Sequence, residues 1–354
     1  EALGNGLEKI VSQGEMINRE NLSKSLVASK NLAKGTIIES QHLSVLSPGQ
    51  GLSAQNYEKL LGRTVKRDML EEDYFYPSDL QDTIIEPKNY KFNRPWGVPV
   101  RYHDFEEYNS KIRPDVFEFH LSYSDLDLNI DEFLTGKYGC GFVVHAPELF
   151  AGSHLMDLAS PDEEYRQYSI IETQRVIEIT RALKKYFPVT KRPMIVANIG
   201  GFTMDELLPP DQLVNYYERF ADSLCLLDME GVELIPQTMA PFPWHFGGQR
   251  YQNLFVHAEE CRYWCDKLNL RMCFDISHSR LMSNHFGVDF YEFAEKIAPI
   301  TGHLHLGDAS GVNGEGLQIG DGDLDFERLA GILDTYCPHA SFIPEIWQGH
   351  KNGG

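Results

Sequence analysis

The 354-residue chain contains no apolar run that approaches the roughly 20 residues needed to span a bilayer. Its first residues, EALGNGLEKI, lack the basic and then apolar pattern of a signal peptide. Basic residues are also scarce, because 32 Lys and Arg stand against 52 Asp and Glu and give a net charge of −20. Nucleic-acid affinity comes largely from cationic groups that neutralise phosphates. We therefore expect a cytoplasmic protein with neither a membrane nor a nucleic acid as its partner.

Cysteine is sparse as well, with six residues scattered along the chain. Cys261 and Cys265 stand four apart on a predicted helix, a spacing that could suit a metal. No second Cys/His pair follows them at the spacing of a zinc finger. Reduced, mostly buried thiols in the cytoplasm are therefore the favoured interpretation.

The length and the texture of the chain predict two modules joined by linkers. Residues 1–23 are polar and are predicted to be a tail or linker, and residues 81–95 an extended linker. Between them, residues 24–80 show short strands separated by the turn signals Lys34-Gly35 and Pro48-Gly49. Residues 96–354 are long enough for a barrel of roughly 250 residues.

From residue 96 onward, short apolar runs alternate with segments of helical periodicity. The apolar runs predict strands at residues 98–102, 116–121, 141–145, 194–198, 232–236, 271–274, 302–306 and 341–344. The helical periodicity covers residues 165–187, 212–228, 251–268, 289–297 and 326–336. Eight runs with intervening helices predict an α/β fold, a (β/α)₈ TIM barrel preceded by a small β-rich domain. Right-handed crossovers would place every strand's carboxyl end on one face.

Acids and imidazoles follow the predicted strands at that face. The last three strands end in Asp275 and His278, then His303, His305 and Asp308, then Glu345. The earlier strands contribute Glu118, His120, His145, Glu148, Asn198 and Gln237, with Trp244 and His245 just beyond. Burying several such groups without partners is costly. Two carboxylates and one or more imidazoles that converge could instead hold a divalent metal such as Zn²⁺ or Mn²⁺.

The first module carries a family resemblance. SLVASKNLAKGTII, followed by LSPGQGLS and LLGRTVKRDM, resembles the antifreeze-like (SAF) domain of the sialic acid synthase family over residues 24–80. In that family the domain follows a synthase barrel, and an arginine at its start reaches a partner subunit's active site to hold the sugar. The matching residue here is Lys24, which keeps the charge but lacks the planar fork of a guanidinium. The resemblance implies that residue 1 lies inside a longer fusion protein, and we expect a homo-oligomer.

The second module carries another resemblance. FDISHS, HLHLGD, IGDGDLDF and FIPEIW resemble the xylose isomerase-like barrel family, which includes the type IV apurinic endonucleases (AP endonuclease type 2), over residues 92–349. The resemblance implies that one divalent metal (Zn, Mn, Mg or Co) is held by Gln237, Asp275, His305 and Glu345. His145 and His278 match further polar positions that the multi-zinc endonucleases use.

Residues that differ from the family pattern reduce the number of reactions that the site could catalyse. Gly314-Glu315-Gly316 stands where the endonucleases carry Asp-x-His, and Asn198 stands at a strand-4 histidine, which disfavours a trinuclear zinc site. Gln237 replaces a carboxylate that sugar epimerases use, and an amide cannot act as a general base. Symmetric two-base epimerisation is therefore disfavoured. Catalysis by Glu345 together with His145, Glu148 or His278 would still support a one-base isomerisation or a dehydration.

These features lead to ranked hypotheses. The first is a metal-dependent isomerase, epimerase or lyase that acts on a sugar or sugar phosphate, in a pathway that makes nonulosonic (sialic-type) sugars for surface glycans. The second is a degenerate, non-catalytic sugar-binding or assembly barrel, in which Gln237 is the first sign that the catalytic site has decayed. Apurinic-site cleavage ranks last, because the cationic surface and the extra zinc ligands are missing. The Gly-rich stretch from residue 307 does not open as strand–GxGxxG–helix, so it predicts a loop over the barrel mouth rather than a dinucleotide site. The residues expected to bind substrate are Lys24, His120, Asn198, Trp244, His245 and Asp308.

Overall fold

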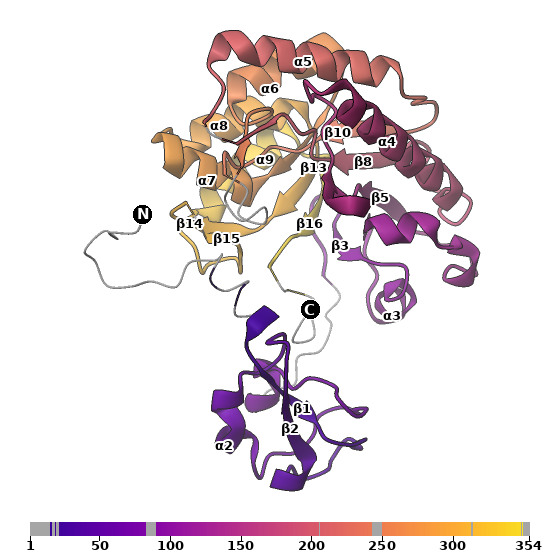
Figure 1. The fold of residues 1–354 in the computed structure, drawn as a ribbon, viewed down its shortest axis with the longest axis vertical. Coiled ribbons are helices and arrows are strands. Elements are labelled where there is room, and N and C mark those ends of the chain that lie inside the picture. Colours follow the sequence, from indigo (N-terminus) through magenta and orange to yellow (C-terminus); the bar gives the residue numbers. More distant parts are fainter. Residues whose placement is uncertain are drawn as a thin grey trace. The chain divides into compact units, whose positions relative to one another are not determined.

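The computed structural model describes residues 15, 18, 21–82, 90–204, 206–242, 250–312, 314–347 and 349. They divide into two compact units, one that holds residues 21–82 and one that holds residues 90–347 (Figure 1). None of the helices in this described part combines the length and the hydrophobicity that a membrane span requires.

The first unit is small and rich in β-structure, as predicted. Strands β1 (Ser25–Ala28) and β2 (Leu43–Leu46) pair antiparallel. Isolated bridges extend the pairing, and the remaining elements are short: η1 (Ser40–His42), η2 (Ala54–Asn56), α2 (Tyr57–Leu60) and η3 (Pro77–Leu80). The unit has its own apolar core, which includes the fully buried side chains of Leu26, Leu60 and Phe75.

The second unit is a closed parallel barrel. Its strands are β3 (Gly97–Val100), β4 (Val116–His120), β5 (Gly141–His145), β8 (Met194–Ala197), β10 (Glu233–Pro236), β12 (Met272–Asp275), β13 (Thr301–Leu306) and β16 (Ser341–Pro344). They form a five-stranded sheet, β10-β8-β5-β4-β3, and a three-stranded sheet, β12-β13-β16. The parallel bridges Gln237↔Cys273 and Trp96↔Phe342 join the two sheets at both edges. The eight predicted strands are confirmed, with their ends shifted by no more than a residue or two.

Helices surround the strands (Figure 1). They are α3 (Phe105–Lys111), α4 (Glu163–Leu183), α5 (Pro210–Cys225), α6 (Ala258–Leu268), α7 (Ile276–Phe286), α8 (Phe290–Ile297) and α9 (Phe326–Tyr336). Aspartates cap several of them: the side chains of Asp162, Asp289 and Asp325 accept backbone N–H groups of α4, α8 and α9. Such caps satisfy N–H groups that have no partner inside the helix.

Two predicted boundaries are wrong. The helix predicted over residues 251–268 begins only at Ala258, because Tyr251–Gln252 is strand β11, which pairs with β9 (Phe202–Thr203). His278 was expected at the carboxyl end of the strand predicted over residues 271–274, but that strand ends at Asp275 and a helix follows directly. The Oδ1 atom of Asp275 accepts the backbone N–H of His278 at 2.8 Å and so starts α7. His278 therefore lies on the first turn of a helix and not on a strand.

Short loop elements complete the carboxyl end of the barrel. One hairpin is β6 (Leu149–Phe150) with β7 (His154–Leu155), and the other is β14 (Asp308–Ser310) with β15 (Gly314–Leu317). The second hairpin lies in the Gly-rich stretch and is attached to the barrel on two sides. The backbone N–H of Gly316 donates to Ser277 on α7, and the carbonyl of Gly316 accepts the N–H of Trp347.

Candidate metal centre

A change from apolar to polar side chains along the strands creates the site. One buried cluster inside the barrel consists of Val116, Val143, Val196, Ile235 and Cys273. Successive side chains of a strand point to opposite faces, so residues two positions apart point to the same face. Two positions further along the same strands stand Glu118, His145, Asn198, Gln237 and Asp275, all of them buried. The barrel interior thus has an apolar floor with a polar layer directly above it.

Asp275, His305 and Glu345 form the group that is best placed to hold a metal. The Nδ1 atom of His305 lies 2.6 Å from Oε2 of Glu345 and 3.7 Å from Oδ2 of Asp275. One ligand atom from each residue lies within 4.8 Å of the other two. Asp275 and His305 are buried, whereas 37% of the Glu345 side chain is exposed. Solvent or a ligand can therefore reach the group at Glu345 but not at Asp275 or His305.

Gln237 completes this group. Its Nε2 donates to Oδ2 of Asp275 at 2.8 Å and lies 3.2 Å from Nδ1 of His305. Its Oε1 lies 3.3 Å from Nε2 of His145. His305 therefore links the four residues predicted to bind metal, since it contacts Gln237, Asp275 and Glu345, and His145 joins them through the amide.

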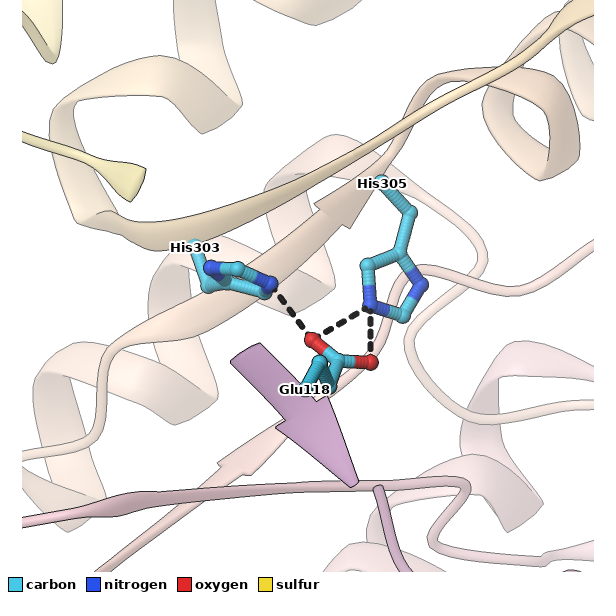
Figure 2. A group of neighbouring side chains, drawn as sticks. All are labelled: Glu118, His303 and His305. Carbon is cyan, nitrogen blue, oxygen red and sulfur yellow. Dashed lines mark hydrogen bonds and ion pairs between the residues drawn. The ribbon is translucent and has the colours of Figure 1, made fainter. Parts of the chain in front are cut away.

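A second group lies beside the first and shares His305 with it (Figure 2). The carboxylate of Glu118 lies within hydrogen-bond distance of His305 Nε2, at 3.0 and 3.3 Å, and forms close ion pairs with His303 Nε2 at 2.6 Å and His120 Nε2 at 2.8 Å. Nδ1 of His303 in turn lies 2.7 Å from the Ser341 hydroxyl. Glu118, His303 and His305 are completely buried, so protein groups rather than water surround the carboxylate of Glu118. Glu118 and His305 are 187 residues apart in the sequence, and closure of the barrel brings them together.

The carboxylates on either side of His305 favour its positively charged form. Burial would lower the pKa of His305, but neighbouring acids including Glu345 and Glu118 raise that pKa well above its ordinary value. Burial would raise the pKa of Glu118, but His305 and His303 bring it well below the usual range. Partial desolvation would raise the pKa of Glu345, but His305 chiefly lowers it below its ordinary value. Burial and the nearby His120 lower the pKa of His145, which favours its neutral form.

His278 pairs with an acid from the hairpin above it. Its Nε2 lies 3.0 Å from Oε1 of Glu315 on β15, and its Nδ1 lies 3.0 Å from the backbone carbonyl of Thr238. Burial lowers the pKa of His278, but Asp275 and Glu315 outweigh it and raise the pKa to about 10. The ring is therefore positively charged at neutral pH and fixes the hairpin to the mouth of the barrel.

The carboxylate of one predicted substrate-binding residue is occupied by backbone groups. Asp308, expected to bind substrate, instead accepts backbone N–H groups of Ala309, Gly320, Gly322 and Leu324 at 2.8–3.3 Å. A Cβ on Gly322 would lie 2.2 Å from Asp308, so only glycine permits this close wrapping of the Gly-rich loop. The carboxylate of Asp308 organises the loop and has little capacity left for a ligand.

Other predicted residues have mixed placements. Asn198 is buried in the polar layer, and its Oδ1 accepts the N–H of Gly200 at 3.1 Å. Glu148 is half-buried between β5 and β6, and Lys24 is exposed in the first unit just before β1. Trp244 and His245 lie outside the described residues.

Sequence reasoning noted Glu118, His303 and Glu315 but gave them no role. The spacing of two between Val116, Glu118 and His120 was the available signal for an inward-facing carboxylate. Nothing in the sequence indicated that His303 and His305 would both meet Glu118 from across the barrel.

The residues present fit a divalent metal. Two carboxylates balance the charge of a divalent ion, and imidazole and amide oxygen are neutral ligands that such ions accept. An ion with bonds of about 2.1 Å separates neighbouring ligand atoms by about 3.0 Å in octahedral geometry and about 3.4 Å in tetrahedral geometry. Among the candidate ligand atoms, Nδ1 of His305 lies 2.6 Å from Oε2 of Glu345 and 3.7 Å from Oδ2 of Asp275, on either side of that spacing.

Comparisons with known proteins agree with this architecture. The family model described as xylose isomerase-like TIM barrel matches residues 113–353, and the SAF domain model matches residues 23–81. In the SAF region, the chain is 36% identical over 72 residues to N,N'-diacetyllegionaminic acid synthase of Campylobacter jejuni. That match covers 20% of this chain and 21% of the synthase, so the chain spans about a fifth of that relative.

Two solved structures share the fold. A D-tagatose 3-epimerase-like protein is 19% identical with a TM-score of 0.51, over 71% of this chain and 90% of its own. An L-ribulose 3-epimerase is 16% identical with a TM-score of 0.50, over 72% of this chain and 81% of its own. Together with the family models, these findings show that the chain belongs to the xylose isomerase-like TIM barrel family and carries an SAF domain ahead of the barrel.

Proposed function

We propose that the chain is an enzyme that binds one divalent metal and isomerises a sugar or sugar phosphate. The observation that carries the proposal is the convergence of Gln237, Asp275 and Glu345 on His305 at the carboxyl end of the barrel strands. Substrates of (β/α)₈ enzymes bind at that end of the barrel. The epimerases that share the fold act on sugars by name, which supports the substrate class.

The four residues would hold the ion, with Asp275 and Glu345 supplying the negative charge. A divalent ion in that place would polarise a carbonyl or hydroxyl oxygen of the sugar. His305 is fixed for this role by the contact of its Nε2 with the buried Glu118, which leaves Nδ1 facing the ligand group. A second hydrogen-bonding partner commonly orients metal-binding imidazoles in this way.

Glu345 is the side chain that would move the proton. Its carboxylate is 37% exposed, so it can reach a substrate carbon while Asp275 and His305 are buried behind it. Gln237, which contacts Asp275, is an amide and cannot act as a second general base. One base on one side of the substrate can take a proton from a carbon next to a carbonyl and return it to the neighbouring carbon. We therefore favour a one-base isomerisation over epimerisation, with dehydration as the nearest variant and His145, Glu148 or His278 as its helper.

The SAF domain suggests the pathway. Its similarity to a legionaminic acid synthase supports a role in the cytoplasmic synthesis of nonulosonic, sialic-type sugars for surface glycans. In this proposal the chain is a homo-oligomer, and Lys24 of one subunit contacts the sugar in a neighbouring one. Light scattering of the full chain and of Lys24→Ala, followed by turnover assays, tests both points.

Solvent exchange tests the activity directly. The full chain would be analysed for bound metal, and then mixed in D₂O with aldoses, ketoses, their phosphates and 2-acetamido sugars. We expect bound divalent metal and deuterium at the carbon next to the carbonyl for at least one sugar class. Glu345→Gln is the matched control, because it keeps the shape of the side chain and abolishes the base. Metal-free protein with no exchange on any sugar would contradict the proposal.

A second candidate function is a non-catalytic barrel that binds a sugar or assembles the fusion protein. Gln237 favours it, since an amide stands where sugar epimerases use a carboxylate. In that case calorimetry would detect sugar binding that is not accompanied by deuterium exchange. Apurinic-site cleavage is disfavoured by the net charge of −20, and we expect negligible binding to duplex DNA at physiological salt.

A further inference from the structure

The amide of Gln237 has three polar neighbours. Whether each neighbouring atom donates or accepts a hydrogen bond determines which orientation of the amide it favours. Nε2 lies 2.8 Å from Asp275 and 3.2 Å from Nδ1 of His305, while Oε1 lies 3.3 Å from Nε2 of His145. An amide oxygen only accepts hydrogen bonds, and an amide nitrogen only donates them. Each contact is therefore favourable in one orientation of the amide and unfavourable in the other.

His145 favours the reverse orientation. Its Nδ1 lies 2.9 Å from the backbone carbonyl of Ala146, which can only accept, so Nδ1 carries the hydrogen. In a neutral ring Nε2 is then a lone pair, and it faces the oxygen of Gln237, which is also an acceptor. A half-turn of the amide would replace this repulsive contact with an N–H donated to Nε2.

His305 favours the reverse orientation as well. Its Nδ1 lies 2.6 Å from the Glu345 carboxylate, which accepts, so a hydrogen lies between them. The amide N–H of Gln237 points at the same Nδ1 from 3.2 Å and meets a donor. After the half-turn an amide oxygen would occupy that position.

Asp275 alone supports the present orientation. Its carboxylate accepts the amide N–H at 2.8 Å, and a half-turn would bring two oxygens together there. A cation between the turned amide oxygen of Gln237 and the carboxylate oxygen of Asp275 would replace their repulsion with attraction, because each oxygen becomes a ligand. The two orientations of an amide have the same shape, so the turn needs no repacking of the buried side chain.

We propose that Gln237 is a metal-responsive ligand whose amide turns its oxygen toward the ion while its nitrogen donates to His145. In this arrangement His145 is a positioning residue, which holds the amide in the metal-binding orientation without touching the ion. The inference rests on the metal site of the proposed function. It goes further by giving a neutral side chain, at a position where epimerases have a carboxylate, a defined partner and a defined role.

Zinc titration of a set of variants tests the proposal. Calorimetry of the full chain with Zn²⁺ would compare wild type, His145→Ala and His145→Gln, each also in a Gln237→Glu background. We expect His145→Ala to weaken Zn²⁺ binding about tenfold, the effect of losing one buried hydrogen bond. His145→Gln should restore most of the affinity, because its amide oxygen can replace Nε2 as an acceptor. With Glu at position 237 no N–H remains to be held, so His145→Ala should no longer weaken binding.

A second measurement follows the amide itself. The side-chain ¹⁵N–¹H signals of Gln237, identified by their absence in Gln237→Glu, should shift when Zn²⁺ binds. Unmoved signals on Zn²⁺ binding, or a loss from His145→Ala that persists with Glu at position 237, would overturn the proposal and leave the metal-dependent function standing. Wild-type protein that binds no Zn²⁺ would overturn both. Thermal midpoints without metal show whether His145→Ala folds, and where it does not, the wild-type signals decide.

Discussion

His305 belongs to two groups of acids and imidazoles, and the two groups differ in what is left free. In the group with Glu118, both carboxylate oxygens are taken by imidazoles and the side chains of Glu118 and His303 are fully buried. In the group with Asp275 and Glu345, the Glu345 side chain is 37% exposed. The same residue types thus build a sealed group and an open one around a single shared ring.

The difference indicates a division of labour. A buried charge is tolerated when its partners satisfy it completely, and such a group then fixes geometry. A site for chemistry instead needs at least one donor that solvent or substrate can reach. We interpret the Glu118 group as the support for His305, and the Glu345 group as the reactive part. The predictions below test that division.

Glu118→Ala should have the largest effect on stability. Removing one partner of a buried charge pair typically costs about 3–5 kcal/mol, because the remaining charge stays buried. His305 would lose the carboxylate that its Nε2 contacts at 3.0 Å. Denaturant titration of metal-free protein measures the loss.

Glu233→Ala is the matched control for this variant. Glu233 is also a strand carboxylate with a cationic partner, Arg271 at 2.7–2.8 Å, but half of the Arg271 side chain (51%) is exposed. Breaking that pair should cost no more than about 1 kcal/mol. Equal losses in the two variants would contradict the view that the Glu118 group is a sealed support.

Asp157 sharpens the comparison, because it is a buried carboxylate that no imidazole in the described part of the chain is seen to contact. Its Oδ1 accepts the N–H groups of Gly201 and Ala159 at 2.8 and 3.0 Å, and a Cβ on Gly200 would lie 2.4 Å from it. Burial outweighs these donors and raises its pKa from 3.8 to about 6. The unfolded chain therefore ionises first as pH rises, so this group lowers stability between pH 4 and 6 and holds the penalty above pH 6.

Asp157→Asn should remove that pH-dependent penalty. Relative to wild type, the variant should gain up to about 3 kcal/mol in unfolding free energy between pH 4 and pH 6, at roughly 1.4 kcal/mol per pKa unit. Denaturant titrations across pH 4 to 7.5 measure the difference between the two proteins. A difference that does not change with pH would show that the Asp157 carboxyl titrates normally in the folded protein.

The fold was predictable from sequence because buried parallel strands appear as short apolar runs. Helix α7 was missed since its capping residue, Asp275, also ends a strand, so the whole motif resembled one run. The start of α6 was misplaced because Tyr251 and Gln252 pair with a distant strand, and periodicity cannot detect such a pairing.

The site was predictable only in part. Residues at strand ends, such as Asp275, His305 and Glu345, follow from the barrel rule that strand carboxyl ends share one face. The partner of a buried carboxylate depends on contacts across the barrel, and Glu118 meets His305 over a separation of 187 residues. Asp308 looked equally reactive in sequence, but the backbone N–H groups of its own loop occupy it.

Glu345→Gln should separate metal binding from stability. Substitutions around metal ligands typically cost 10- to 100-fold in affinity, and a direct ligand should cost at least as much. Because the Glu345 side chain is 37% exposed, we expect little change in the metal-free thermal midpoint. Zn²⁺ calorimetry and thermal melts of both proteins provide the two readings. A large fall in the metal-free midpoint with unchanged Zn²⁺ affinity would place Glu345 with the supporting residues.

Gln237→Glu should have the smallest effect, and its sign should depend on the metal. The substitution places a second carboxylate near Asp275, at the position where Nε2 now donates at 2.8 Å. Without metal the like charges repel, so the thermal midpoint should fall. With metal, the added charged oxygen is a better ligand for a divalent ion than an amide, so affinity should rise. We expect a gain of about tenfold, equivalent to about 1.4 kcal/mol.

A rival view places Gln237 outside the ligand group, hydrogen-bonded to the loop from Met239 toward Trp244. The side-chain contacts of Gln237 with Asp275, His305 and His145 favour the ligand role. The rival predicts a lower midpoint for Gln237→Glu both with and without metal, and an unchanged affinity. The ligand role predicts that the two melting curves cross as Zn²⁺ is added, because the same carboxylate that destabilises the empty group stabilises the filled one. Melting both proteins across a Zn²⁺ series therefore distinguishes the two views by the direction of a shift.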